Sequence, residues 1–237
     1  MGELSEPVSS RGKVLFAAFR YSIPVLLGYV TIGLAFGLFL SETGYPWWLA
    51  FVMSFWMFAG AAQFIAVGLF AAGTSLWEAC FIQLVVNARH MAYGLSMLTH
   101  YRDTGFLKPY LVFSLTDETF ALLSTPPEMP AEEKRLFMFY VSLLDQSYWI
   151  TGSVVGALAG ALFPFDMTGV GFALTALFVV LMIEQIKKSK NYRLFILSAV
   201  AAIAGLLLFP GRISLLISLV LALFFSPFIK TGKKEKK

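Results

Sequence analysis

The sequence is poor in charged residues and almost free of cysteine. Only 14% of its 237 residues are charged, 58% are hydrophobic, and the mean hydropathy is +0.76. A soluble domain carries about 25% charged residues, so this chain lacks the charged surface that a soluble enzyme needs. Its single cysteine, Cys80, cannot form a disulfide within the chain, so it does not report the redox compartment.

The sequence also lacks common catalytic and nucleotide-binding motifs. It contains no phosphate-binding strand-loop-helix motif and neither the HExxH nor the GxSxG pattern. On one helix, His90 and His100 would lie about 15 Å apart, too far to share one metal ion. We therefore predict that the protein is not an enzyme, needs no metal or cofactor, and draws any energy it uses from an ion gradient.

Long apolar runs, rather than short alternating strands, make up most of the chain. They predict an all-α fold: a polytopic helical membrane bundle of about seven to eight segments, some of them broken or re-entrant. The expected segments are 21–40, 43–77, 76–98, 110–124, 136–163, 168–183, 194–209 and 213–229. Counting 110–124 as a crossing gives eight crossings, and so does omitting it while 43–77 passes twice.

Basic residues gather in the loops and tails and predict the orientation of the chain. The clusters lie at 11–13, 134–135, 187–193 and 230–237. By the positive-inside rule all of them belong in the cytoplasm. We therefore expect a cytoplasmic segment 1–12, one transmembrane domain 13–229 and a basic tail 230–237, with both termini cytoplasmic. The net charge of +4 then reflects topology and does not indicate a nucleic-acid partner.

A long uncharged stretch lies between Glu42 and Glu78. As one straight helix it would be about 50 Å long, whereas the hydrocarbon core of a bilayer is ~30 Å thick. We expect a break at the string AGAAQF, at Gly60 and Ala61, with Gln63 in the middle of the run. Discontinuous helices often form transporter sites. Because glycine is ordinary in membrane helices, a break without a functional role is the alternative.

The stretch VVNARHMAYG, from Val85 to Gly94, places polar groups inside an apolar segment. At helical spacing these groups form two stripes. One stripe holds Gln83, Asn87, His90 and Gly94, and the other holds Arg89, Tyr93, Ser96 and His100. A helix that is polar on two sides should be central in the bundle or unwound around Asn87 to His90. An intramembrane arginine costs ~2.5–3.5 kcal/mol or more, so Arg89 is a functional candidate; the alternative is a packing ion pair with a carboxylate.

Two carboxylates, Asp117 and Glu118, lie in the middle of the short run 110–124. The run is too short and too acidic for an ordinary span and suits a half-helix or a re-entrant segment. Alternatively, Ser114 or Thr116 caps a surface helix whose first turn holds both acids.

A third carboxylate, Asp145, lies inside the apolar run 136–163. Three roles are open to it: balancing Arg89, carrying a proton, or lying near the membrane interface without a function.

The two halves of the chain show a weak internal sequence similarity. KVLF from Lys13 and KRLF from Lys134 each lead to a helix with GxxxG spacing, which allows close helix contact. These spacings occur at Gly33 and Gly37 and at Gly152, Gly156 and Gly160. This similarity is a weak indication of a two-half repeat with a site between the halves. The halves would be 13–125 and 134–229.

Three strings in this order carry a resemblance to a known family: SFWMFAGAAQFIAVGLF from Ser54, VVNARHMAYG from Val85, and SLTDETFAL from Ser114. The chain resembles the AzlC family of branched-chain amino acid exporters from about Phe16 to Leu206. The resemblance implies export of valine, leucine and isoleucine across a bacterial inner membrane. It also implies a partner, a small AzlD-type membrane subunit.

A hydrophobic amino acid is a zwitterion, and the chain offers groups for each of its parts. Arg89 or the backbone N–H groups near Gly60 would take the carboxylate, acidic side chains the ammonium, and a histidine or carboxylate a coupling proton. The predicted substrate site consists of Gln63, Asn87, Arg89, His90, Tyr93, Asp117, Glu118 and Asp145, with the helix break at Gly60 and Ala61. The alternatives are a permease subunit of an ATP-driven system and a passive channel or structural subunit.

Overall fold

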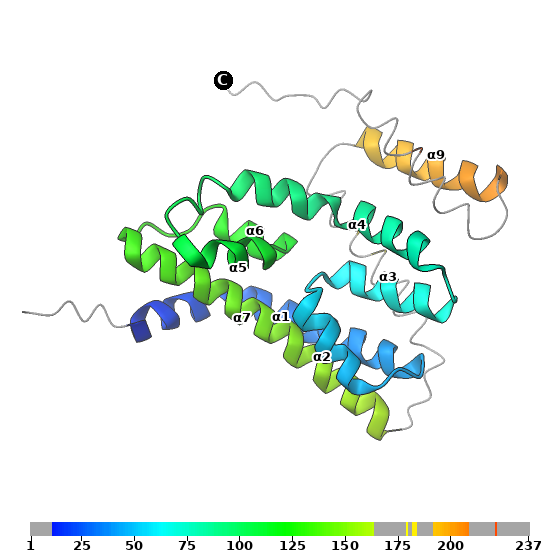
Figure 1. The fold of residues 1–237 in the computed structure, drawn as a ribbon, viewed down its shortest axis with the longest axis horizontal. Coiled ribbons are helices and arrows are strands. Elements are labelled where there is room, and N and C mark those ends of the chain that lie inside the picture. The colour runs from blue at the N-terminus through cyan, green and yellow to red at the C-terminus, as the bar shows by residue number, and fades with distance from the viewer. Residues whose placement is uncertain (1–10, 164–178, 180–181, 184–191, 209–220, 222–237) are drawn as a thin grey trace, which may run out of the picture. The chain divides into compact units, whose positions relative to one another are not determined.

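The structure, a computed structural model, describes residues 11–163, 179, 182–183, 192–208 and 221. Within these residues every regular element is a helix, which confirms the all-α prediction for this part of the chain. The helices are α1 (Arg11–Glu42), α2 (Trp47–Trp56), α3 (Gly60–Ala71), α4 (Leu76–Met97), the 3₁₀ helix η1 (Gly105–Leu107), α5 (Lys108–Phe113), α6 (Asp117–Leu123), α7 (Ala131–Leu162) and α9 (Tyr192–Leu208) (Figure 1).

The chain divides into two units, Met1–Met167 and Thr168–Lys237. In the second unit, α9 occupies the run predicted at 194–209. The predicted runs 168–183 and 213–229 lie almost entirely outside the described residues, as do most of segment 1–12 and the basic tail. The two-half repeat and the cytoplasmic placement of both termini therefore stay predictions.

Among the described helices, α1 is the one long and apolar enough to cross a membrane, judged by length and composition. Its 32 residues would span about 48 Å, more than a hydrocarbon core of ~30 Å. The helix continues through Pro24. The apolar helices α2 and α3 are shorter, so the number of crossings stays a prediction.

The helices α1 and α7 pack against each other through small residues, as the GxxxG spacing predicts. The glycines of this contact are Gly33 and Gly37 on α1 and Gly152 and Gly156 on α7. A Cβ atom on Gly33 would lie 3.0 Å from the backbone nitrogen of Ser153, and one on Gly152 would lie 2.8 Å from the carbonyl oxygen of Val30. The contacts advance in the same direction along both helices, so α1 and α7 run parallel (Figure 1).

Two helical segments are broken. Between α2 and α3 the chain unwinds at 57–59, where Phe58 adopts the left-handed φ of 36°. A break therefore occurs in the predicted run, but just before Gly60 and Ala61, which start α3. A second break, at 114–116, separates α5 from α6.

The second break combines both expectations for its segment. Thr116 is the N-cap of α6, because its side chain accepts a hydrogen bond from the backbone N–H of Thr119, and the two acids lie in the first turn. One side of α6 is buried, at Thr119 and Leu123, whereas Glu118 is exposed, so a re-entrant course of this segment stays a prediction.

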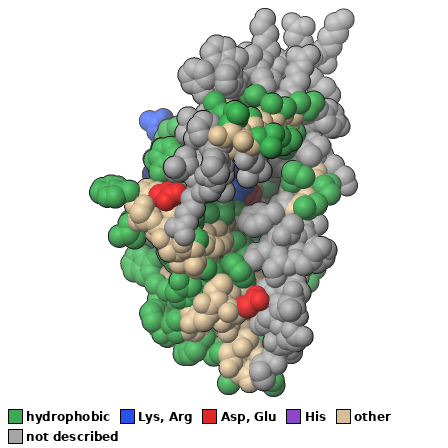
Figure 2. Space-filling view, turned by 90° about the vertical axis from the view of Figure 1, so that its right-hand side faces the viewer, with side chains coloured by type: hydrophobic (Ala, Val, Ile, Leu, Met, Phe, Trp, Pro, Cys, Tyr) green, Lys and Arg blue, Asp and Glu red, His purple; other side chains and the backbone are tan. Residues whose placement is uncertain are grey.

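In contrast, α4 is unbroken. Ser75 caps it by accepting from the N–H of Glu78, and the helix continues to Met97. The expected unwinding around Asn87 to His90 is therefore wrong. The helix is not enclosed by the described residues either, since Leu84 and Leu95 are exposed. Hydrophobic side chains cover much of the described surface seen in Figure 2, as suits contact with lipid.

Candidate functional site

The two helix breaks come together beside α1 and α7. Tyr29 of α1 connects them, because its ring centroid lies 6.3 Å from that of Phe58 and its hydroxyl hydrogen-bonds to Thr116. Trp149 of α7 packs edge-on against Tyr29 at a centroid distance of 5.5 Å. The rigid α1–α7 pair thus holds both breaks in place.

The start of α3 lacks a side-chain cap. Its N-cap residue is Ala59, which makes no side-chain hydrogen bond, and the first N–H groups of a helix have no partner within it. The aligned peptide dipoles make such an end electropositive. Gly60 permits a close approach here, since a Cβ atom on it would lie 3.0 Å from the Trp149 ring.

Gln63 braces this helix start from within the core. It is fully buried, accepts a 2.6 Å hydrogen bond from Trp149 Nε1, and donates to Ser54 Oγ at 3.2 Å. These contacts join α2, α3 and α7. In this structure Gln63 therefore positions the break.

The first polar stripe of α4 faces α3. Gln83 donates through Nε2 to the carbonyl oxygen of Ala62 at 2.9 Å. Asn87 donates to the carbonyl oxygen of Gln83 at 2.9 Å, while its Oδ1 is buried without a hydrogen-bond partner. His90, which is partly buried, lies next to Tyr93 at a ring-centroid distance of 5.9 Å.

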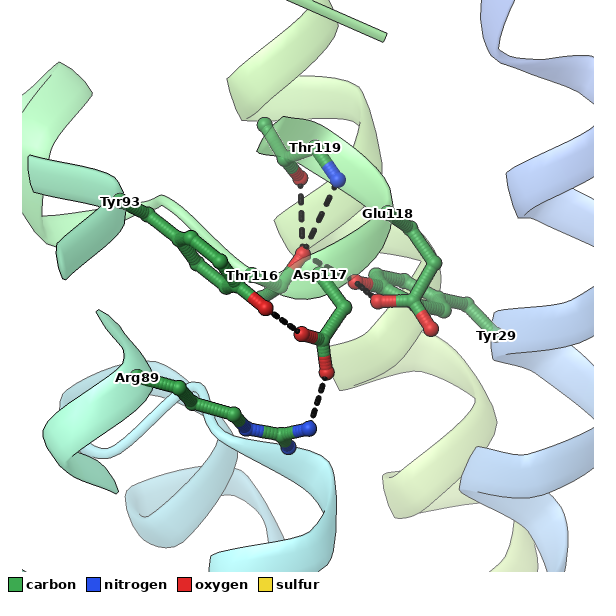
Figure 3. A network of polar contacts seen from close by, with 7 residues as sticks. All are labelled: Tyr29, Arg89, Tyr93, Thr116, Asp117, Glu118 and Thr119. Carbon is green, nitrogen blue, oxygen red and sulfur yellow. Dashed lines mark hydrogen bonds and ion pairs between the residues drawn. The ribbon is translucent and has the colours of Figure 1, made fainter. Parts of the chain in front are cut away.

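The second stripe of α4 faces α6. Arg89 Nη1 lies 2.6 Å from Asp117 Oδ2, with 42% and 31% of the two side chains exposed. Tyr93 donates its hydroxyl hydrogen to the other oxygen of Asp117 and stacks on Phe120 at 4.5 Å. Figure 3 shows Asp117 pointing toward Arg89 and Tyr93. The exposure leaves the guanidinium accessible to a further ligand.

Glu118 points away from Arg89, toward α1, where its Oε2 accepts a 2.8 Å hydrogen bond from Tyr29 (Figure 3). Asp145 of α7 is fully buried and accepts a 2.8 Å hydrogen bond from Thr119. Asp145 is therefore not the partner of Arg89, which pairs with Asp117, and its other two expected roles stay predictions.

The structure thus sorts the predicted site residues into separate groups. Arg89, Tyr93 and Asp117 form one cluster, and Glu118 and Asp145 belong to another that is joined by hydroxyl groups. The other predicted residues lie at helix contacts around these clusters: Gln63, Asn87, His90, Gly60 and Ala61. Their roles in substrate binding stay predictions.

Sequence reasoning missed three residues that contact the predicted site: Tyr29 bonds to Glu118, Thr119 to Asp145 and Trp149 to Gln63. A signal existed for two of them. Tyr29 is a hydroxyl-bearing residue deep inside the first apolar run, and Trp149 stands one helical turn after Asp145. Thr119 offered no such signal, because threonine is common near helix starts.

An open pocket of about 500 Å³ lies elsewhere, between the connection that follows α4 and the start of α7. His100, Asp103, Lys134 and Arg135 are among its lining residues, which include none of the predicted site. Over the described part of the chain, no three His, Cys, Asp or Glu side chains gather as they would around a metal ion.

Comparisons with known proteins agree on one family. A family model described as AzlC protein matches residues 24–163. An uncharacterized membrane protein of Helicobacter pylori is 44% identical over 204 residues, which cover 86% of this chain and 90% of that protein. The branched-chain amino acid transport protein AzlC of Bacillus subtilis is 38% identical over 196 residues, 83% of this chain and 77% of that protein.

The inner membrane protein YgaZ of Escherichia coli is 29% identical over 209 residues, 84% of each chain. No solved structure matches this chain. The relatives from Helicobacter pylori and Escherichia coli are membrane proteins by name, and that from Bacillus subtilis is named for transport. This chain is accordingly a membrane protein with a role in transport, and it belongs to the AzlC family.

Proposed function

We propose that the protein exports branched-chain amino acids, such as valine, leucine and isoleucine, across a bacterial inner membrane. The substrate class is suggested by the name of the Bacillus subtilis relative. The observation that carries the proposal is the meeting of two helix breaks, one offering an uncapped electropositive helix start and the other two carboxylates. Broken helices of this kind place opposite charges where a zwitterion needs them.

Each part of the substrate has a partner in this arrangement. The N–H groups at the start of α3 and the exposed guanidinium of Arg89 suit the carboxylate. Asp117 and Glu118 suit the ammonium group. Phe58, at the first break, and other aromatic side chains provide apolar surface for a branched side chain.

The proposal includes proton coupling and a partner. A proton gradient drives export, because Asp145 is a carboxylate that is fully buried among the helices. A small AzlD-type membrane subunit works with this chain, and the chain is multi-pass with both termini cytoplasmic.

Counterflow in lipid vesicles that contain the full chain, with and without the small subunit, tests the substrate class. We expect saturable exchange of labelled valine, leucine and isoleucine, and no exchange of glutamate, whose charged side chain does not suit the apolar surface at Phe58. Flux that does not saturate would indicate a channel, and flux that does not discriminate would contradict the proposed substrate class.

A protonophore tests the coupling in the same vesicles. Uphill export driven by a proton gradient should collapse when the protonophore is added, whereas counterflow without a gradient should continue. Uphill export that resists the protonophore would contradict proton coupling and leave the substrate class standing.

A further inference from the structure

A row of hydroxyl groups connects the two carboxylates Glu118 and Asp145. Its oxygen atoms, in order, are Glu118 Oε2, Tyr29 OH, Thr116 Oγ1, Thr119 Oγ1 and Asp145 Oδ2. Each of the four oxygen–oxygen contacts is 3.0 Å or shorter. The row crosses from α6 to α1, returns to α6 and ends on α7; Figure 3 shows it from Glu118 to Thr119.

The number of hydrogen atoms in this row is informative. Every contact needs one hydrogen, so four are required. Tyr29, Thr116 and Thr119 supply one each, which makes three. Among the described residues, the one other donor bonded to the hydroxyls of the row is the backbone N–H of Thr119, which points at Thr116 Oγ1 and lies in none of the four contacts. If both carboxylates were ionised, two buried oxygens would face each other without a hydrogen between them, which is costly.

We propose that Glu118 and Asp145 share one proton, which passes between them along Tyr29, Thr116 and Thr119. With the proton on Glu118, each hydroxyl donates toward Asp145. With the proton on Asp145, each hydroxyl donates toward Glu118. In both arrangements all four contacts are hydrogen bonds. Transfer of the proton from one carboxylate to the other only reverses the direction in which each hydroxyl donates.

The surroundings of the row also favour one retained proton. No described Lys, Arg or His forms an ion pair with Asp145 or Glu118, and Asp145 Oδ1 is buried without a hydrogen-bond partner. Besides the groups of the row, the titratable groups that act on Asp145 are Tyr110 of α5 and Tyr148 of α7. The titratable groups near Glu118 are Tyr29, which belongs to the row, and Tyr93. The Arg89–Asp117 ion pair lies next to Tyr93. None is a free cation, so a negative charge on the buried Asp145 would have no cationic partner.

The two ends of the row differ in access. Glu118 is exposed, whereas Asp145 is fully buried. The row therefore leads a proton from an accessible carboxylate to one inside the bundle. Its use in export rests on the proton-driven function proposed above, but the sharing of a proton does not.

Infrared spectroscopy of the full chain in lipid vesicles near neutral pH tests the sharing without any substrate. A protonated carboxylic acid has a C=O stretching band that a carboxylate lacks. We expect Glu118→Gln and Asp145→Asn each to lower this C=O band by the intensity of one protonated carboxylic acid. In each variant the new amide donates the missing hydrogen, so the remaining carboxylate can ionise. Tyr29→Phe should remove the same intensity, since the shortened row needs no extra proton.

Tyr148→Phe is the matched control, because Tyr148 is also buried and hydrogen-bonds to Ser22 outside the row. The band should keep its full intensity in this variant. The proposal is overturned if the unchanged chain shows no such band, if the band survives in Glu118→Gln and Tyr29→Phe, or if the control loses it as well. Because Glu118 is exposed, Glu118→Gln is the variant least expected to disturb folding.

Discussion

Arg89→Ala is expected to lower amino acid export by at least a factor of ten, about 1.4 kcal/mol. The guanidinium lies 2.6 Å from Asp117, yet 42% of its side chain is exposed, so it has donors left for a substrate carboxylate. Its loss removes this charge and leaves Asp117 without its cation. Export from loaded vesicles, measured beside the amount of protein in the membrane, checks the result.

Three further variants separate binding from packing. Arg102→Ala removes an exposed arginine in the loop after α4 and should leave export unchanged. Arg89→Lys should give intermediate export, because lysine keeps the charge but loses the planar fork that binds a carboxylate at two points. The exchanged pair Arg89→Asp with Asp117→Arg should remain inactive. Restored export in this pair would contradict a substrate role, because it would show that the ion pair only holds α4 against α6.

The neighbours of α4 could be inferred from the sequence because the helix has two polar stripes. Buried polar groups need partners, and the chain offers few other polar stretches within its apolar runs. In the structure Gln83 of one stripe contacts Ala62, while Arg89 and Tyr93 of the other contact Asp117. The predicted unwinding of α4 failed for the same reason. A backbone carbonyl of α3, the Asp117 carboxylate of α6 and a carbonyl of the preceding turn of α4 accept hydrogen bonds from these groups, so the backbone of α4 need not open.

The partners of Asp145 could not be inferred from the sequence. Helical periodicity places a side chain on a face of its own helix, but it does not tell which helix covers that face. Asp145 meets Thr119 because α6 is a short capped helix that starts at the second break, and Glu118 meets Tyr29 because α1 passes beside it. Both contacts depend on helix crossings, which follow from three-dimensional packing.

The parallel course of α1 and α7 limits the topology. If both helices cross the bilayer, they cross in the same direction, so an odd number of crossings must lie between them. Only α4 and the two broken segments α2/α3 and α5/α6 are available for this. Both topologies expected from the sequence meet this condition: α2/α3, α4 and α5/α6 cross once each, or α2 and α3 cross separately and α4 crosses while α5/α6 does not. A repeat that matches α1 with α7 is a parallel one, since the two helices point the same way.

Gly156→Ala is expected to destabilise the protein although it adds a single methyl group. A Cβ atom on Gly156 would overlap the backbone of Leu34 in α1, and a backbone cannot turn aside as a side chain can. The cost should be about 1–3 kcal/mol, as for other overpacked contacts, and should lower the temperature of thermal unfolding in detergent. Separation of α1 from α7 would also loosen both helix breaks, since Tyr29 and Trp149 hold them.

Gly28→Ala makes the same chemical change where there is room. A Cβ atom on Gly28 in α1 has no neighbour within 4 Å, and alanine is favoured over glycine in a helix by about 0.8–1.0 kcal/mol. This variant should therefore be neutral or more stable, opposite in sign to Gly156→Ala. Equal destabilisation by both substitutions would show that α1 and α7 respond to any added methyl group. The close contact at Gly156 would then not explain the loss of stability. Opposite shifts would tie stability to the place where the two backbones touch.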